Sequence, residues 1–195
     1  ELLRLFLEFS PDICFHLEIH PALLSEELKK ELRQLPAGLL HLEAGIQSLR
    51  EPVLEKSRRI GKLSDALEGL KFLCSLSNME THADLIAGLP LYRLDEIFED
   101  IYTLAGYRAG EIQLESLKLL PGTEMRHRAD ELGIRYSPLP PYEVLQTGEI
   151  SVGELQTARR LSRLLDAFYN TPAWQELTRE LILNAVSYTH LRAHE

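Results

Sequence analysis

Polar side chains recur at every second position in four segments of the sequence, residues 14–20, 41–48, 81–88 and 111–120. Alternate residues of a β-strand point to opposite faces, so each segment predicts a strand with one apolar and one polar face. The polar residues of these segments are His16, Glu18, His20, His41, Glu43, Gln47, His82, Asp84, Glu111, Gln113 and Glu115. Carboxylates, imidazoles and amides in this number favour a bound polar ligand, because burying them without partners is costly.

Other interpretations of these polar faces stay open. The side chains can satisfy one another, or they can face solvent on an open sheet. A metal site is a further interpretation, because several histidines share a face with carboxylates. The sequence has no HxxxH helix or other compact ligand spacing, so we predict no metal ligands.

Composition limits the classes of function. The chain has 195 residues, a net charge of −9 and 45% hydrophobic residues, which suffices for one sizeable core or for part of a larger domain. The acidic balance argues against a nucleic-acid surface, and no apolar run is long enough to cross a bilayer. Cys14 and Cys74 are too far apart for a CxxC site or a disulfide framework, so they predict a reducing, cytoplasmic environment.

Helical patterns lie between the four predicted strands. Ser25 is placed to start a helix that ends near Gln34, and Ser64 to cap another over residues 65–76. A third helix is predicted over residues 94–107. Its expected buried face consists of Leu94, Ile97, Phe98, Ile101 and Leu104. Because strands alternate with helices four times, the sequence predicts parallel βα units with right-handed crossovers.

The predicted fold class is α/β, a partial TIM-like barrel of about four βα units followed by a small helical segment. The helices should cover the apolar faces, so the polar faces should line the concave side. Four units are too few for a closed eight-fold barrel of roughly 250 residues. We predict a barrel part over residues 1–135 and a helical domain over residues 136–186. The last residues, 187–195, do not continue the helical pattern and are interpreted as a non-native, adaptor-derived tail.

Several motifs together resemble the second half of a radical S-adenosylmethionine (SAM) enzyme barrel. They are GIQSL at 45–49, VLEKSRR at 53–59, HADLIAGLP at 82–90 and LESLKLLPGT at 114–123. The likeness covers residues 1–184. It is strongest to B12-binding radical SAM proteins with a C-terminal domain of unknown function, in which PPYEVL and a YN helical segment follow the barrel. Here these stand at 140–145 and 169–170.

The resemblance implies a set of SAM-binding residues. By similarity to oxygen-independent coproporphyrinogen oxidase-like barrels, Glu18 would bind the SAM amino group, and Gln47 and Asp84 would bind the ribose. Arg59, chosen over Arg58 by the L-x-x-S-x-R frame, would bind the SAM carboxylate. The chemistry agrees, because an ammonium pairs with a carboxylate and a carboxylate pairs with a guanidinium.

The resemblance also implies an adenine site at Gly88 and the backbone around Leu117. It implies an incomplete (β/α)6 barrel with a [4Fe–4S] cluster on a CxxxCxxC loop, and often a preceding cobalamin domain. That loop is absent, so both features are expected upstream of residue 1. Three thiolates must converge on such a cluster, and two separated cysteines cannot replace them.

The function that the resemblance implies is reductive SAM cleavage to start radical chemistry on an unknown small substrate. A reductant such as flavodoxin or ferredoxin would be a partner. This chain alone is expected to be inactive without the iron–sulfur loop. Two other hypotheses stay open, a metal-dependent TIM-barrel hydrolase and a non-catalytic barrel remnant that serves as a binding module.

Overall fold

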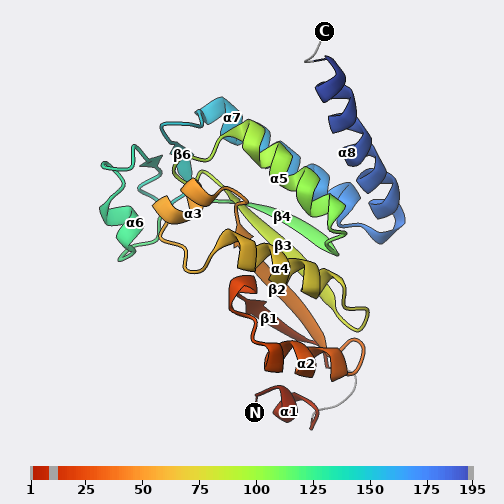
Figure 1. The fold of residues 1–195 in the computed structure, drawn as a ribbon. Coiled ribbons are helices and arrows are strands. Elements are labelled where there is room, and N and C mark those ends of the chain that lie inside the picture. Colours follow the sequence, from red (N-terminus) through yellow and green to blue (C-terminus); the bar gives the residue numbers. More distant parts are fainter. Residues whose placement is uncertain (1, 9–12, 193–195) are drawn as a thin grey trace.

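The computed structural model describes residues 2–8 and 13–192. Four parallel strands form one sheet in the order β1–β2–β3–β4 (Figure 1). They are β1 (Phe15–Ile19), β2 (Leu40–Gln47), β3 (Glu80–Ala87) and β4 (Glu111–Ser116). Consecutive strands are neighbours and run in the same direction, so the predicted parallel βα units are confirmed.

Helices α2, α4 and α5 lie on one face of this sheet (Figure 1). The helices are α1 (Leu2–Phe6), η1 (Pro21–Leu23), α2 (Glu26–Gln34), α3 (Glu51–Lys56), α4 (Leu63–Cys74), α5 (Leu94–Gly106), α6 (Glu124–His127), α7 (Val152–Leu164), the π-helical turn η2 (Leu165–Tyr169) and α8 (Pro172–Arg192). None of the described helices is both long and apolar enough to span a membrane.

Burial alternates in β1, in β2 and in the first four residues of β4, as the sequence pattern predicts, whereas in β3 residues 81–85 are all buried. In β2, Leu40, Leu42, Ala44 and Ile46 are buried, and the residues between them are only partly buried. The apolar side chains pack with those of the covering helices in one core. The polar side chains therefore lie on the opposite face of the sheet.

The two predicted helix starts have different outcomes. Ser25 caps α2, because its Oγ accepts a hydrogen bond from the Leu28 N–H at 3.2 Å. Ser64 is not a cap. Helix α4 begins at Leu63, and the Ser64 hydroxyl donates to Asp65 instead. A serine one position inside a helix makes a local side-chain contact of this kind rather than a cap.

The predicted buried face of α5 needs correction. Ile97, Ile101 and Leu104 are buried, but Phe98 is 44% exposed. Asp100 is fully buried in its place. Apolar spacing alone does not predict this, because Asp100 is held by donors from other elements.

The chain after β4 docks against that strand. Asn170 Oδ1 accepts from the Ile112 N–H at 2.9 Å, and its Nδ2 donates to the Ile112 carbonyl at 3.1 Å. The neighbouring Tyr169 hydroxyl donates to the Ala109 carbonyl at 2.9 Å. The YN pair therefore occupies backbone groups at the outer edge of β4, where a further strand would otherwise pair. The predicted helical segment after the barrel part contains two α-helices, α7 and α8, on either side of this pair.

The segment before these helices contains two short strands. Strands β5 (Arg135–Tyr136) and β6 (Val144–Gln146) pair in antiparallel fashion. The predicted boundary between residues 135 and 136 lies inside β5 and stays a prediction. Helix α8 continues to Arg192, so the expected end of the helical pattern before residue 187 is wrong. No glycine or proline interrupts this stretch, and an established helix propagates easily.

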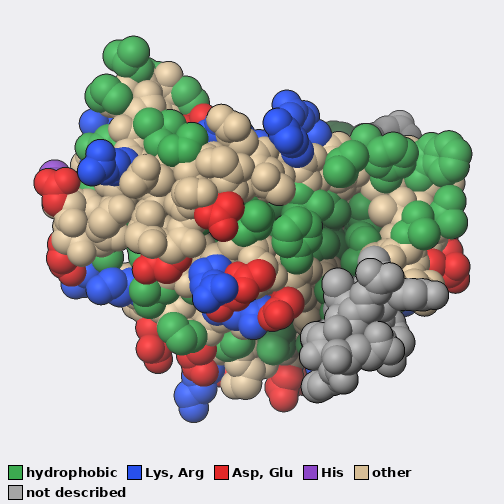
Figure 2. Space-filling view, turned by 90° about the horizontal axis from the view of Figure 1, so that it is seen from above, with side chains coloured by type: hydrophobic (Ala, Val, Ile, Leu, Met, Phe, Trp, Pro, Cys, Tyr) green, Lys and Arg blue, Asp and Glu red, His purple; other side chains and the backbone are tan. Residues whose placement is uncertain are grey.

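The C-terminal helices leave an apolar surface uncovered by the described residues. Its exposed large side chains are Leu164, Phe168, Trp174, Leu177 and Leu181. They border a groove of about 460 Å³ between α7, η2 and α8. Figure 2 shows hydrophobic side chains gathered on one side of the molecule. The C-terminal helices therefore have an exposed apolar surface in addition to the residues that they bury against β4.

Candidate functional site

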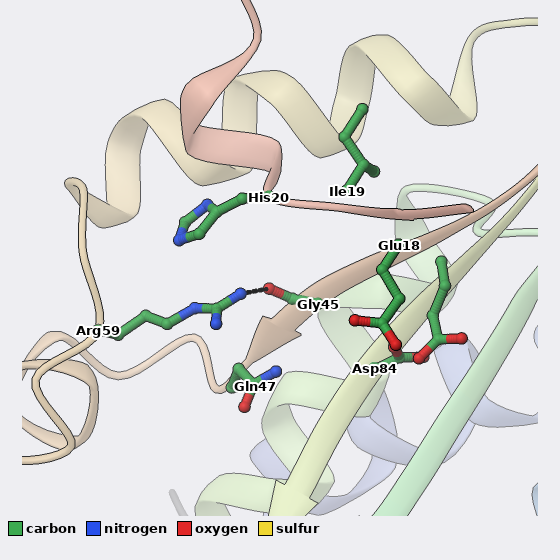
Figure 3. A pocket seen from close by; sticks show the side chains of 8 residues that line it. Glu18, Ile19, His20, Gly45, Gln47, Arg59 and Asp84 are labelled. Atoms are coloured by element: carbon green, nitrogen blue, oxygen red, sulfur yellow. Dashed lines mark hydrogen bonds between the residues drawn. The ribbon is translucent and has the colours of Figure 1, made fainter. Parts of the chain in front are cut away.

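A cavity of about 270 Å³ opens on the polar face of the sheet. Its lining residues are Glu18, Ile19, His20, Glu43, Gly45, Gln47, Arg59 and Asp84. Figure 3 shows Arg59 reaching in from the loop after α3, with Glu18 and Asp84 on the other side of the cavity. The structure therefore brings together four of the six predicted site residues, Glu18, Gln47, Arg59 and Asp84.

An irregular end of β2 positions two of these residues. The pairing of β2 with β3 shifts between Gly45 and Gln47, and Gln47 adopts a φ of 71°. A Cβ at position 45 would lie 3.1 Å from Gln47 Nε2 and 3.2 Å from Arg59 Nη2. Because Gly45 has no side chain, Arg59 Nη2 approaches closely and donates to the Gly45 carbonyl at 2.6 Å.

Asp84 is the most perturbed acid of the cavity. Its side chain is buried, and its Oδ1 has no hydrogen-bond partner among the described residues. Burial is the main cause that raises the pKa of Asp84 from 3.8 to about 8. A hydrogen bond and negative charge from Glu43, followed by the charges of Glu115 and Glu18, raise it further. The carboxyl groups thus stand where a cation would stabilise them.

The basic side of the cavity also has unused hydrogen-bonding atoms. Arg59 is partly buried, its Nε has no partner in the part of the chain that the structure describes, and burial lowers its pKa. His20 Nδ1 accepts from the Ala22 N–H at 3.3 Å, and its Nε2 is buried without a partner there. Burial and the nearby Arg59 charge lower the pKa of His20. Arg59 is therefore able to bind an anionic group of a ligand.

The two adjacent arginines have separate positions. Arg58 is exposed and forms an ion pair with Glu124 on α6. Arg59 lines the cavity and bonds a backbone carbonyl of β2. Only Arg59 can reach the groups on the polar face, which is the position that the sequence frame assigned to it.

A second cavity of about 300 Å³ continues from the first and shares His20, Gln47 and Arg59 with it. Leu117 lines this second cavity. The Leu117 N–H donates to Ala87 and its carbonyl accepts from Val144, both at 2.9 Å. The Leu117 N–H is therefore not free to bond adenine. Leu117 contributes to this cavity as one of its lining residues.

Gly88 lines neither cavity. It has a φ of 94°, and an added Cβ would lie 3.3 Å from the Val144 side chain. Its role in the structure is a tight passage from β3 to the following turn, beside Leu117. The sequence did not assign roles to His20 and Glu43 in the SAM site, although the alternation had placed both on the polar face.

The thiols do not fit an iron–sulfur cluster. Cys14 is exposed just before β1, and Cys74 is the last residue of α4. Burial raises the pKa of the Cys74 thiol to about 11, which disfavours the thiolate form. A [4Fe–4S] cluster needs thiolates that converge, and these 195 residues contain two cysteines. The chemistry of the cavity residues, by contrast, fits SAM. Its carboxyl groups suit the positive groups of SAM, and Arg59, whose Nε is unused among the described residues, suits the SAM carboxylate.

Comparison with known proteins gives one family match and several structural neighbours. A family model described as a protein of unknown function (DUF4080) matches residues 130–189. No curated protein sequence matches the chain. The radical SAM methyltransferase TsrM from Kitasatospora setae, solved with cobalamin and a [4Fe–4S] cluster, has a TM-score of 0.55 and 17% identity over 71% of this chain and 30% of its own.

Two further structures are similar in fold. TsrM with tryptophan substrate and the SAM analogue aza-SAM has a TM-score of 0.52 and 17% identity, over 70% of this chain and 28% of its own. Elp3 from Methanocaldococcus infernus has a TM-score of 0.54 and 16% identity, over 78% of this chain and 42% of its own. The first part of the chain therefore has the fold of a partial TIM-like barrel as found in radical SAM proteins, and it spans less than half of each neighbour.

Proposed function

We propose that this chain is the SAM-binding part of a radical SAM enzyme. The observation that supports the proposal best is the cavity in which three carboxyl groups, Glu18, Glu43 and Asp84, lie opposite Arg59. Arg59 bonds a backbone carbonyl and has no carboxylate partner among the described residues. Among the described residues Glu43 contacts His16 Nε2 at 3.0 Å, whereas Glu18 and Asp84 form no ion pair with a basic side chain and Arg59 forms none with an acid.

SAM carries both missing charges. Its ammonium and sulfonium groups suit the carboxyl side of the cavity, and its carboxylate suits the Arg59 guanidinium, which can bind a carboxylate in a fork. Gln47 extends from the same wall as Arg59 and offers an amide to the ribose hydroxyls. Asp84, whose pKa is about 8, would lose its proton as a cation approaches, so binding strengthens with its ionisation.

The reaction proposed for the whole protein is reductive cleavage of SAM to start radical chemistry on a substrate that these residues do not identify. That activity requires cluster-binding thiolates from outside the 195 residues. A reductant of the flavodoxin or ferredoxin kind and a cobalamin domain belong to the same proposal. This chain contributes the groups that bind and orient SAM.

The test is SAM binding to the chain, measured by titration calorimetry. Replacing Asp84 by Ala removes a charged partner of the ligand and should weaken SAM binding by roughly ten- to a hundredfold, which corresponds to about 1.5–3 kcal/mol. Asp65, exposed on α4, is the matched control, and its replacement by Ala should leave the affinity unchanged.

S-adenosylhomocysteine sharpens the test, because it lacks the sulfonium charge. The wild-type chain should prefer SAM over this analogue, and the Asp84→Ala variant should lose most of that preference. Equal SAM affinities for the wild type and the Asp84→Ala variant would exclude this cavity as the SAM site.

A further inference from the structure

A second group of polar side chains lies on the same sheet face but nearer the amino ends of the strands. His16, His41 and His82 come from β1, β2 and β3, and each offers a ring nitrogen within 4.8 Å of the others. His16 stands directly opposite His41 in the strand register, and the two rings stack at 4.8 Å between centroids. His82 meets the His41 ring edge-on at 4.0 Å between centroids.

Three atoms that can each act as a metal ligand converge at one point of this group. His41 Nε2 points at His82 Nε2, and Glu111 Oε2 lies 3.0 Å from that same His82 nitrogen. One hydrogen on His82 Nε2 cannot be shared well between two acceptors, and placing it on His41 leaves Glu111 facing a lone pair. A single cation at this point would satisfy all three atoms at once.

One outer group orients a ring in the way that a metal-binding histidine requires, because Glu80 Oε2 lies 3.5 Å from His41 Nδ1. An acceptor at the far nitrogen holds a hydrogen there and leaves Nε2 available to a metal. At His82 the amide nitrogen of Gln113 lies 2.9 Å from Nδ1, and a half-turn of this amide would present its oxygen as the acceptor instead. His82 is buried, so its orientation is set by packing as well.

We propose that His16, His41, His82 and Glu111 form a binding site for a divalent transition metal ion such as zinc. Nitrogen and oxygen ligands in a four-coordinate zinc site stand roughly 3.3–3.4 Å apart, given bonds of about 2.0–2.1 Å. The three histidine nitrogens lie within 4.8 Å of one another, and Glu111 Oε2 lies 3.0 Å from His82 Nε2, so binding would require these side chains to turn toward one ion.

The site is accessible to an ion from solvent. A cavity of about 330 Å³ adjoins it, with His41 and Glu80 in its wall. The sequence left a metal site open as one interpretation of these histidines, but it predicted no ligands because they come from four strands, with no two of them in a short motif. Its four residues do not line the cavity proposed for SAM, although His16 Nε2 lies 3.0 Å from Oε2 of Glu43, which does.

The experiment is metal titration of the untagged chain after chelator treatment. Cobalt(II) is the spectroscopic probe, and zinc affinity follows from competition with a chelating dye. The wild type should bind one equivalent and show the visible bands of four-coordinate cobalt. At zinc concentrations about a hundredfold above Kd, the melting temperature should rise by roughly 5–10 °C.

Variants separate this site from the other histidines of the chain. The His41→Gln and His82→Gln variants should each lose at least about a hundredfold in zinc affinity, whereas His127→Gln, in the exposed α6, should lose none. The combined His190→Ala and His194→Ala change tests the C-terminal histidines and should also have no effect.

The Glu80→Gln variant covers the case in which the core variants misfold. Glu80 is 79% exposed on its side chain, so its replacement should not affect folding, but it should weaken zinc binding by about 10- to 100-fold. Failure of the wild type to bind one equivalent would overturn the proposal. Binding that survives His82→Gln, or that is lost with the C-terminal histidines, would overturn it equally.

Discussion

Two buried aspartates on neighbouring elements have opposite surroundings. Asp100 on α5 is fully buried, and Asp84 on β3 is 8% exposed. Asp100 accepts hydrogen bonds from Ser48 Oγ at 3.4 Å, Leu49 N at 2.7 Å, Arg50 Nε at 2.9 Å and the Tyr92 hydroxyl at 2.6 Å. Asp84 has an Oδ1 without a partner in the described residues and carboxyl groups as neighbours.

The difference separates a structural carboxylate from one suited to a ligand. Burial raises the pKa of both groups, but the donors around Asp100, including the Arg50 charge, oppose that rise. The neighbours of Asp84 add to the rise instead. Asp100 joins the end of β2 to α5 with every partner supplied by the chain. Asp84 lacks such partners, and a cationic ligand would supply one.

The largest expected effect is on stability at Asp100. Replacing it by Ala would leave the Arg50 guanidinium, the Leu49 N–H and the Tyr92 hydroxyl without their acceptor. We expect a loss of about 3–5 kcal/mol in the free energy of unfolding, or roughly 6–20 °C in melting temperature. Urea denaturation followed by circular dichroism measures it.

Glu99 is the control for this change, because it pairs with the same Arg50 but is exposed. Its replacement by Ala should lose less than about 1 kcal/mol. Similar losses for the two variants would mean that Asp100 is not the centre of the network.

A smaller effect of opposite sign is expected at Asp84. Its folded-state pKa of about 8 lies above its ordinary value of 3.8, so ionisation is harder in the folded chain than in the unfolded one. The ligand-free chain should therefore lose stability as pH rises from about 4 to about 8. The Asp84→Asn variant keeps the shape but cannot ionise, and it should be about 1–3 kcal/mol more stable at pH 8.

The measurement is the melting temperature of both proteins between pH 4 and pH 8. The gain should vanish near pH 4, where wild-type Asp84 is protonated in the folded chain. A variant that is less stable than the wild type at pH 8 would show that the charge of Asp84 is already compensated within the chain.

The smallest stability effect is expected at Arg59. Replacing it by Gln removes one hydrogen bond to the Gly45 carbonyl, which should change the free energy of unfolding by less than about 1 kcal/mol. The same replacement at Arg50 removes the charge that compensates Asp100 and should be several times more destabilising. SAM affinity should fall roughly tenfold or more in the Arg59→Gln variant. A large stability loss at Arg59 would instead make it part of the scaffold.

The amino-acid pattern was enough to predict the order of elements and the two faces of each strand. Alternating polarity is a local property with a period of two residues, so residues such as Glu43 and Gln47 could be placed on one face of β2 without the structure. The number of polar residues on these faces favoured a bound ligand over mutual pairing. The similarity in fold to radical SAM structures agrees with the resemblance that the sequence motifs indicated.

Which polar groups find partners depends on how the chain packs in three dimensions. The burial of Asp100 depends on hydrogen-bond donors that follow the end of β2. Asn170 bonds the backbone of Ile112 in β4, although the two residues are 58 positions apart along the chain. The convergence of His41 and His82 depends on a register between two strands. These contacts join residues that are distant in sequence, and no local period records them, so the sequence pattern could not distinguish Asp100 from a surface acid.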